Sequence, residues 1–298
     1  MPGSSSACAA APPRTSARAG NRVVLLPELH GARSGPGRDR RDRLAPEEPR
    51  PGAGQPGRAA RAGEALQVLV VGVSALNCPA ARTLAAAGVG TLVLVDPDRV
   101  ELSNLHRQPL YRADAIGRLK VESAADALRA AFPGVRLETH ACRLDAGNLP
   151  GFFAAADFVV DATDGAETKF LINDGAVRCG TPFSHAGILG FLGQTMTVLP
   201  GRSACLRCLF PEPPSADETV SCRDAGVVGA LAGVVGAIQA GEAIKHLTGR
   251  GEPLANRLLT IDALSGAWRR IALTRSSRCP VCVSPVPGRR LDAADVAR

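Results

Sequence analysis

Side chains that can bind a nucleotide follow an apolar segment in the sequence LVLVDPDRVELSNLHRQ. Asp96 ends that apolar segment 24 residues after Gly72, a spacing at which a carboxylate can bind both hydroxyls of a ribose. Asn104 and Arg107 follow three residues apart, and Lys120 lies further on. Two cations and an amide near such an aspartate favour a polyphosphate ligand over a nicotinamide. The alternative for Asp96 is a solvated carboxylate in a turn.

A second pair of carboxylates lies in the sequence VVDATDG. Asp161 ends an apolar run, and Asp164 lies in the loop that follows. A carboxylate at the carboxyl end of a strand is a natural Mg²⁺ ligand beside phosphates. The alternative is an Asx turn or a helix N-cap, which suits Asp161 better than Asp164.

Two Cys-x-x-Cys pairs are separated by 70 residues. CLRC supplies Cys205 and Cys208, and CPVC supplies Cys279 and Cys282. Two such pairs are typical of a structural zinc site with four thiolates, and the long separation means that the fold must bring them together. Disulfides are one alternative, but no feature of the sequence marks the chain as secreted. A redox-active dithiol is the other.

A single cysteine, Cys222, lies in the polar segment VSCRDAG before a long helix-like region. A cysteine in a loop just before a helix can have a lowered pKa and act as a nucleophile. The alternative is an incidental thiol, and the residues around Cys222 favour this alternative when they are taken by themselves.

Composition disfavours several other classes of protein. The net charge is +7, but residues 1–65 hold eleven arginines and six acidic residues, so the remainder carries only +2. Because no basic stripe is interleaved with aromatic residues, we expect no nucleic-acid partner. No apolar stretch approaches the roughly 20 residues of a membrane span, and the N-terminus lacks the apolar region of a secretory signal. We expect a cytoplasmic protein, although residues 1–27, with arginines and no acidic residue, faintly resemble an organelle transit peptide.

The sequence divides into four parts. Residues 1–30 are an N-terminal arm, residues 31–62 a Gly-, Pro- and Arg-rich insert that we expect to be disordered, residues 63–284 the main domain and residues 285–298 a tail. Strand-like and helix-like segments alternate in the main domain, which indicates a parallel sheet covered by helices. Strands are predicted at 67–72, 91–95, 135–139, 157–162, 193–199, 257–262 and 267–273, and helices at 78–88, 114–132, 165–179 and 227–249. The expected fold class is α/β, a Rossmann-like, doubly wound and mostly parallel sheet with a zinc-bound C-terminal β region.

Taken in this order, the segments resemble the MoeB/ThiF-type adenylyltransferases of the ubiquitin-activating-enzyme superfamily. The matching segments are DPDRVELSNLHRQ, GRLKVESA, DATD, CLRCLFPEPP, SCRDAGVVG, GVVGAIQAGEAIK and CPVC. RVVLLPEL near the N-terminus is similar to the family's RQILLPEL, with Val23 in place of glutamine. The resemblance covers 66–283 and identifies 63–284 as a ThiF-type adenylation domain with a zinc knuckle.

The resemblance implies roles for the residues of the nucleotide site. Asp96 would hold the ribose of ATP, and Asp164 would bind Mg²⁺. Asn104, Arg107 and Lys120 would bind and neutralise the phosphates.

It also implies roles outside the nucleotide site. Arg22 would reach into the active site of the second subunit of a homodimer. Cys222 matches a cysteine that takes part in acyl or sulfur transfer in some members of the family. The Zn²⁺ ligands would be Cys205, Cys208, Cys279 and Cys282.

The implied reaction is ATP-dependent adenylation of the C-terminal glycine of a ubiquitin-like sulfur-carrier protein ending in Gly-Gly, with release of pyrophosphate. Such MoaD- and ThiS-type carriers serve molybdopterin and thiamine biosynthesis. The chain ends soon after Cys282, so we expect the sulfur donor to be a separate protein. One alternative is an NAD(P)-dependent dehydrogenase, which does not require this set of charged residues and cysteines. The other is a degenerate family member that docks a carrier without adenylating it.

The loop sequence GVSALN departs from the family's usual G-x-G-G-x-G. Gly72 is retained, whereas Ser74 and Asn77 replace glycines. Ser74 is small, and its hydroxyl can donate to a phosphate, so Gly72 and Ser74 are both expected to contact ATP. Asn77 is a preferred helix N-cap, and its side-chain oxygen is expected to bond amides that would otherwise face an anion. We therefore predict weakened, but not abolished, ATP binding.

Overall fold

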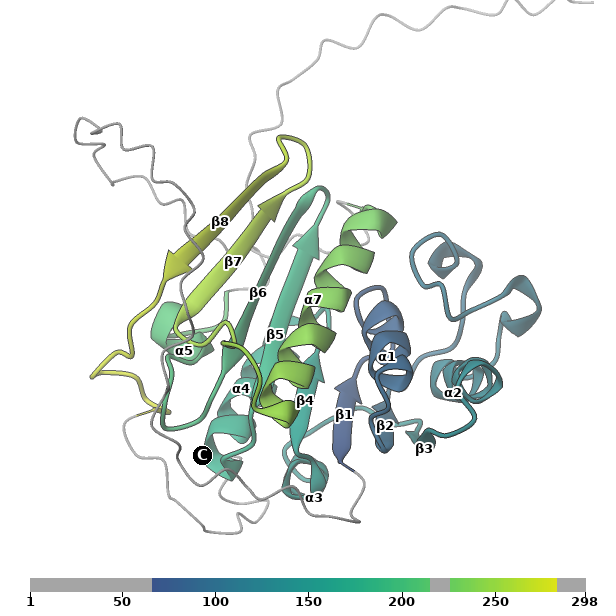
Figure 1. The fold of residues 1–298 in the computed structure, drawn as a ribbon, viewed down its shortest axis with the longest axis horizontal. Helices are drawn as coiled ribbons and strands as arrows, with labels where there is room; N and C mark the ends of the chain where they lie inside the picture. The colour runs from purple at the N-terminus through teal and green to yellow at the C-terminus, as the bar shows by residue number, and fades with distance from the viewer. Residues whose placement is uncertain (1–65, 215–225, 283–298) are drawn as a thin grey trace, which may run out of the picture.

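The computed structural model describes residues 66–214 and 226–282, which form one eight-stranded sheet with helices on both faces (Figure 1). The strand order is β3-β2-β1-β4-β5-β6-β7-β8. Strands β1 to β5 pair in parallel, and β5 to β8 pair antiparallel. This arrangement confirms the predicted α/β class with a Rossmann-like, mostly parallel half. The predicted arm at 1–30, insert at 31–62 and tail at 285–298 lie outside the described residues.

The elements have the following bounds. The strands are β1 (Gln67–Val71), β2 (Thr91–Val95), β3 (Arg136–His140), β4 (Phe158–Asp161), β5 (Phe183–Leu189), β6 (Leu192–Val198), β7 (Arg257–Asp262) and β8 (Ala267–Ala272). The α-helices are α1 (Asn77–Ala86), α2 (Lys120–Ala131), α3 (Leu149–Ala155), α4 (Ala166–Cys179), α5 (Leu206–Leu209) and α7 (Gly229–Thr248), with 3₁₀ turns η1 (Leu102–Asn104) and η2 (Ala113–Ala115). Among the described residues, no helix is both long enough and apolar enough to cross a membrane.

The parallel strands are apolar on both faces because helices cover both faces. In β1, Val68 and Val70 pack in one core with residues of α1, α2 and α7. Leu69 and Val71 point the other way and pack with residues of α3 and α4. A short, continuous apolar run such as QVLVV is what a strand buried on both sides requires.

The pairing register aligns the carboxyl ends of three strands. Val71, the last residue of β1, pairs with Val95 of β2 and with Asp161 of β4. Gly72 and Asp96 therefore leave the sheet at the same edge, where the N–H of Gly72 donates to the carbonyl oxygen of Val95 at 2.8 Å. Gly72 has a φ of 78°, a left-handed conformation that glycine adopts without a steric cost. This edge is where doubly wound sheets bind ligands.

Most of the predicted elements are present, with ends shifted by one or two residues. The prediction of one continuous helix over 114–132 is wrong. The 3₁₀ turn η2 ends at Ala115, and α2 begins only at Lys120. Gly117 between them has a φ of 89°, which no helical residue adopts. The elements α3 and β5 were not predicted, because α3 is only seven residues long and β5 (FSHAGIL) mixes polar and apolar residues.

Helix α7 approaches the rest of the fold closely through its glycines. A Cβ atom at Gly236 would lie 2.0 Å from the carbonyl oxygen of Leu76 and 2.8 Å from Cγ of Pro79, at the start of α1. On the sheet side, a Cβ atom at Gly193 of β6 would lie 2.9 Å from Cγ2 of Val235. Figure 1 shows α7 running beside α1 and across the sheet. The small residues of α7 therefore fix where the loop after β1 can lie.

We expect Gly236→Ala to lower the free energy of unfolding by about 2–3 kcal/mol, because the added methyl group overlaps the backbone of Leu76, the residue just before α1. Gly233→Ala on the same helix is the matched control, since its Cβ would have nothing within 4 Å. That control should leave stability unchanged or raise it by up to about 1 kcal/mol. Urea denaturation of both variants measures the difference. Equal stabilities would show that α7 does not depend on this close contact.

Candidate functional site

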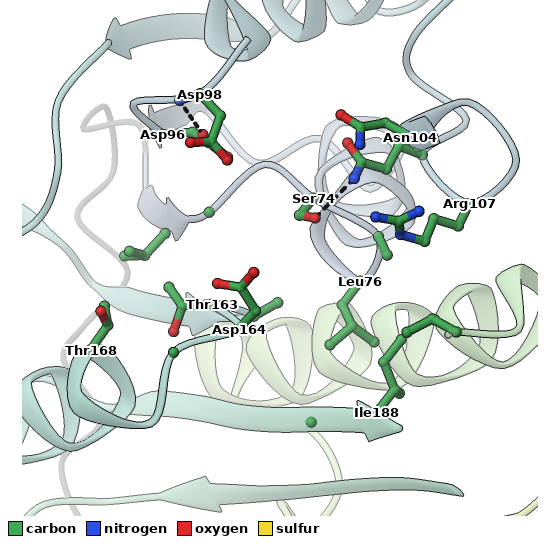
Figure 2. A pocket seen from close by; sticks show the side chains of 18 of the residues that line it. Ser74, Leu76, Asp96, Asp98, Asn104, Arg107, Thr163, Asp164, Thr168 and Ile188 are labelled. Atoms are coloured by element: carbon green, nitrogen blue, oxygen red, sulfur yellow. Dashed lines mark hydrogen bonds between the residues drawn. The ribbon is translucent and has the colours of Figure 1, made fainter. Parts of the chain in front are cut away.

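A cavity of about 800 Å³ opens at the edge of the sheet where β1, β2 and β4 end (Figure 2). Its walls come from the loops after these strands, from the first residue of α2, from the segment after β3, from β5 and β6, and from residues just before α7. All the nucleotide-binding residues predicted in the main domain line this cavity: Gly72, Ser74, Asp96, Asn104, Arg107, Lys120 and Asp164. The fold therefore brings together residues that lie in separate segments of the sequence.

Asp96 is held firmly at the end of β2. Its Oδ2 accepts the N–H of Val73 at 2.7 Å, and its Oδ1 accepts the N–H of Asp98 at 2.8 Å. The residue is buried, and this burial raises the pKa of the carboxyl although the charge of Lys120 opposes the shift. The alternative of a solvated turn aspartate is therefore wrong. Each carboxylate oxygen has a second lone pair, so both can still accept the hydroxyls of a ribose.

Lys120 supplies a buried cation to the cavity wall. It is the first residue of α2, and its Nζ donates to Oδ2 of Asp98 at 2.7 Å. The side chain of Asp98 is 61% exposed, whereas that of Lys120 is 7% exposed. An ammonium group has three N–H donors, and this ion pair uses one of them. Lys120 can therefore donate to an anion in the cavity while it keeps its carboxylate partner.

Asn104 and Arg107 are placed by the 3₁₀ turn η1. Asn104 is buried, and its Oδ1 accepts the N–H of Glu101 at 3.2 Å. Nη1 of Arg107 donates to the carbonyl oxygen of Ser103 at 2.6 Å and lies 2.8 Å from Nε2 of His106. The side chains of Asn104 and Arg107 lie together on one side of the cavity (Figure 2), as their spacing predicted. Within the described part of the chain, Arg107 has no carboxylate partner, so its charge is available to a phosphate.

Asp161 has a structural role beneath the cavity. Its Oδ1 accepts hydrogen bonds from the N–H and the hydroxyl of Thr163 at 3.0 and 2.8 Å, which is the Asx turn that the sequence allowed. Its Oδ2 lies 3.0 Å from Nδ1 of His185 and 3.5 Å from Nζ of Lys169. Although burial acts to raise it, the pKa of Asp161 is held at about 2 by these neighbours. The ionised carboxylate fixes the start of the loop that carries Asp164.

Asp164 extends from that loop into the cavity (Figure 2). The residue is exposed, and its carboxylate makes no hydrogen bond or ion pair with any of the described residues. A free carboxylate that faces a cavity beside Arg107 and Lys120 is a suitable ligand for Mg²⁺ bound to phosphates.

The predicted role of Asn77 as a helix N-cap is wrong. Leu76 occupies the N-cap position, and Asn77 is the first residue of α1 and is fully buried. The Nδ2 of Asn77 donates to the carbonyl oxygens of Val71 and Gly72, both at 2.8 Å. The side chain therefore braces the end of β1 and does not cap the helix amides.

The two Cys-x-x-Cys pairs meet on the far side of the sheet from α7. The four sulfur atoms lie within 4.8 Å of one another, with Cys205 to Cys279 at 3.6 Å and Cys208 to Cys282 at 3.7 Å. All four are free thiols, so the disulfide alternative is wrong for this structure. Four sulfurs in a tetrahedron around Zn²⁺, each at ~2.3 Å, are roughly 3.8 Å apart. The cluster therefore has the geometry of a structural metal site.

Two predicted residues, Arg22 and Cys222, lie outside the described residues. The residues of the site that were not predicted from the sequence include Gln108, Lys169 and His185. Gln108 and Lys169 line the cavity, while His185 pairs with Asp161. Their spacing was the available signal, since Gln108 lies one helical turn beyond Asn104 and Lys169 lies five residues beyond Asp164.

Comparison with proteins of known function adds independent evidence. A sulfur carrier protein adenylyltransferase of Thermus thermophilus is 44% identical over 220 residues, which is 72% of this chain and 81% of that protein. The SAMP-activating enzyme E1 of Haloferax volcanii is 44% identical over 72% of this chain and 80% of its own length. The adenylyltransferase and sulfurtransferase uba4 of Emericella nidulans is 43% identical over 72% of this chain, but the match spans only 48% of that longer protein.

Solved structures agree on the fold. The crystal structure of E. coli MccB with MccA-N7isoASN matches with a TM-score of 0.65 at 24% identity, over 73% of this chain and 67% of that chain. Likeness at this level of identity shows a shared fold only. The model of the ThiF family matches residues 56–281, which include the cavity and three of the four clustered cysteines. The chain therefore belongs to the ThiF family.

Proposed function

We propose that this protein catalyses the ATP-dependent adenylation of the C-terminal glycine carboxylate of a ubiquitin-like sulfur-carrier protein. One observation carries the proposal. A single cavity holds a buried carboxylate, an amide, two cations and a free carboxylate, all at the carboxyl ends of parallel strands. The same chain is 44% identical to a named sulfur carrier protein adenylyltransferase. The two lines of support are independent, because the cavity is defined by geometry alone.

The chemistry requires two anions to meet. A carboxylate oxygen of the carrier attacks the α-phosphorus of ATP, and a new P–O bond forms as the bond to the α,β-bridging oxygen breaks. Pyrophosphate leaves with that electron pair, and the product is an acyl-adenylate. No general base is needed because the nucleophile is already deprotonated. The task of the enzyme is to align the groups and to offset their negative charges.

The residues of the cavity suit these tasks. Asp96 is fixed by two backbone N–H groups and would accept the ribose hydroxyls. Asn104, Arg107 and Lys120 would bind the phosphates, and Lys120 retains donors beyond its ion pair with Asp98. Asp164 fits Mg²⁺ because its carboxylate is exposed in the cavity and makes no bond to the described residues. Bound Mg²⁺ would supply further positive charge to the phosphates.

The four clustered cysteines would hold a structural Zn²⁺. Their sulfur atoms are spaced as a tetrahedral thiolate site requires, and three of the four residues are buried. One pair comes from the start of α5 and the residue before it, and the other from the segment after β8, so the ion would join two parts of the chain that are distant in sequence.

Further expectations rest on family resemblance. Arg22 would complete the active site of the second subunit in a homodimer, and Cys222 would take part in transfer to sulfur. The carrier would end in Gly-Gly and serve the molybdopterin, the thiamine or another sulfur pathway.

The structure changes the basis of one earlier expectation, that of weak ATP binding. Neither Ser74 nor Asn77 has a positive φ. The side chain of Asn77 does not accept hydrogen bonds from the N–H groups at the start of α1, because its Nδ2 donates to the carbonyl oxygens at the end of β1. We therefore propose that the altered loop is compatible with ATP binding.

Loss of the proposed Mg²⁺ ligand tests the catalytic role of the cavity. ATP–pyrophosphate exchange should depend on a carrier that ends in Gly-Gly, and Asp164→Ala should lower its rate by about 100-fold or more, because charge neutralisation at the phosphates is lost. Glu167→Ala is the matched control, since Glu167 is an exposed carboxylate nearby that does not line the cavity. Absence of exchange with any carrier, together with absence of ATP binding in calorimetry, would leave the chain as a docking protein.

Metal content and thermal stability test the proposed zinc site at the cysteine cluster. The purified protein should contain about one zinc per chain, and Cys205→Ser should lose the metal and lower Tm by roughly 5 °C or more. Cys179→Ser is the control, because Cys179 lies at the end of α4 outside the cluster. Elemental analysis and thermal unfolding measure both effects. A metal-free wild-type protein with an unchanged Tm in Cys205→Ser would contradict the zinc assignment.

A further inference from the structure

We propose that Gln108 orients the hydroxyl of Ser74 so that it donates a hydrogen bond to a phosphate oxygen of the bound nucleotide. The inference rests on the proposed use of ATP and deepens it. It assigns a function to one of the two residues that replace glycine in the loop after β1, and it adds Gln108 to the site as a positioning residue.

The pair is defined by one hydrogen bond at the wall of the cavity. Nε2 of Gln108 donates to Oγ of Ser74 at 3.0 Å, and both residues line the cavity. The dashed line at Ser74 in Figure 2 marks this bond. Gln108 is 1% exposed, and its backbone is fixed because its N–H donates to the carbonyl oxygen of Asn104 at 3.0 Å. The amide therefore has little freedom to leave Ser74.

The backbone of the loop is also fixed. The N–H of Val73 donates to Asp96, and the carbonyl oxygen of Val73 accepts the hydroxyl of Tyr111 at 2.6 Å. The carbonyl oxygen of Ser74 accepts the N–H of Cys78 at 2.9 Å as α1 begins. Hydrogen bonds therefore fix the backbone of Val73 and of Ser74, and with it the position from which the serine side chain extends.

The donor count decides what Ser74 can do. A hydroxyl group has one proton to donate, and its oxygen can accept from others. Because the oxygen accepts from Gln108, the proton must point elsewhere, and no described residue accepts it. The hydroxyl proton of Ser74 is therefore free for an acceptor in the cavity, as expected where a ligand completes the hydrogen bonds of a site.

The position of the pair favours a phosphate as that ligand. Ser74 lies on the same side of the cavity as Asn104 and Arg107, apart from the Asp96 side chain that would bind the ribose (Figure 2). A hydroxyl that donates to an ionised phosphate oxygen forms a charge-assisted bond, which is stronger than a bond between neutral groups. A glycine at this position would offer no such donor.

Isothermal titration calorimetry with Mg²⁺ and either ATP or adenosine tests the inference. Ser74→Ala should weaken ATP binding about tenfold, because a hydrogen bond to a charged group is lost, and should change adenosine binding by less than about twofold. Ser74→Thr, which keeps the hydroxyl, should bind ATP as tightly as the wild-type protein. Thr83→Ala is the matched control, since it removes a hydroxyl that donates to Pro79 within α1 and does not line the cavity.

The role of Gln108 is tested by a double-mutant cycle. Gln108→Leu should weaken ATP binding about threefold, and the double variant should bind no more weakly than Ser74→Ala alone, because Gln108 acts only through the hydroxyl of Ser74. ATP binding by Ser74→Ala within twofold of wild type would overturn this inference and leave the adenylation proposal intact. An equal loss for ATP and adenosine would also overturn it, since that pattern reports a disturbed loop. A wild-type protein that binds no ATP would overturn both proposals.

Discussion

Parallel pairing of β1 with β2 and β4 is the constraint on which the site depends. Because Val71 pairs with both Val95 and Asp161, three strands end at the same level, and the chain turns out of the sheet at one edge. The backbone of the first loop then lies close enough for Val73 to donate to Asp96. A shift of one residue in this register would turn the buried side chains to the opposite face. It would also separate the carboxylates from the cavity.

Buried polar groups turn this strand edge into a fixed site. Asp96 joins the first loop to β2, Asn77 braces the end of β1, and Asp161 holds the turn that carries Asp164. The carboxylates of Asp96 and Asp161 and the amide nitrogen of Asn77 have hydrogen-bond partners, which offset the cost of removing these groups from water. Helix α7 closes the arrangement from one face through the contact at Gly236. The charged groups of Arg107 and Asp164, which have no oppositely charged partner among the described residues, face the cavity, as preorganised binding requires.

The sequence predicted those parts of the structure that depend on local pattern. Strand length and spacing predicted the apolar runs of β1 and β2 and the carboxylate at Asp96. The spacing of the two Cys-x-x-Cys pairs predicted that their four sulfur atoms lie together. The break between η2 and α2 was missed because Gly117 requires a positive φ that its neighbours do not signal. The role of Asn77 was also missed. Its propensity for caps is a local preference, whereas its actual partners belong to β1 and lie across a turn.

The central claim is that a carrier carboxylate attacks the α-phosphorus of ATP. The most direct measurement follows ATP labelled at the α-phosphate, incubated with the protein, Mg²⁺, inorganic pyrophosphatase and a carrier ending in Gly-Gly. The account predicts that label becomes attached to the carrier as an acyl-adenylate and that a thiol nucleophile releases it as AMP. Label that stays in ATP, or that appears only in ADP with none on the carrier, would contradict the account.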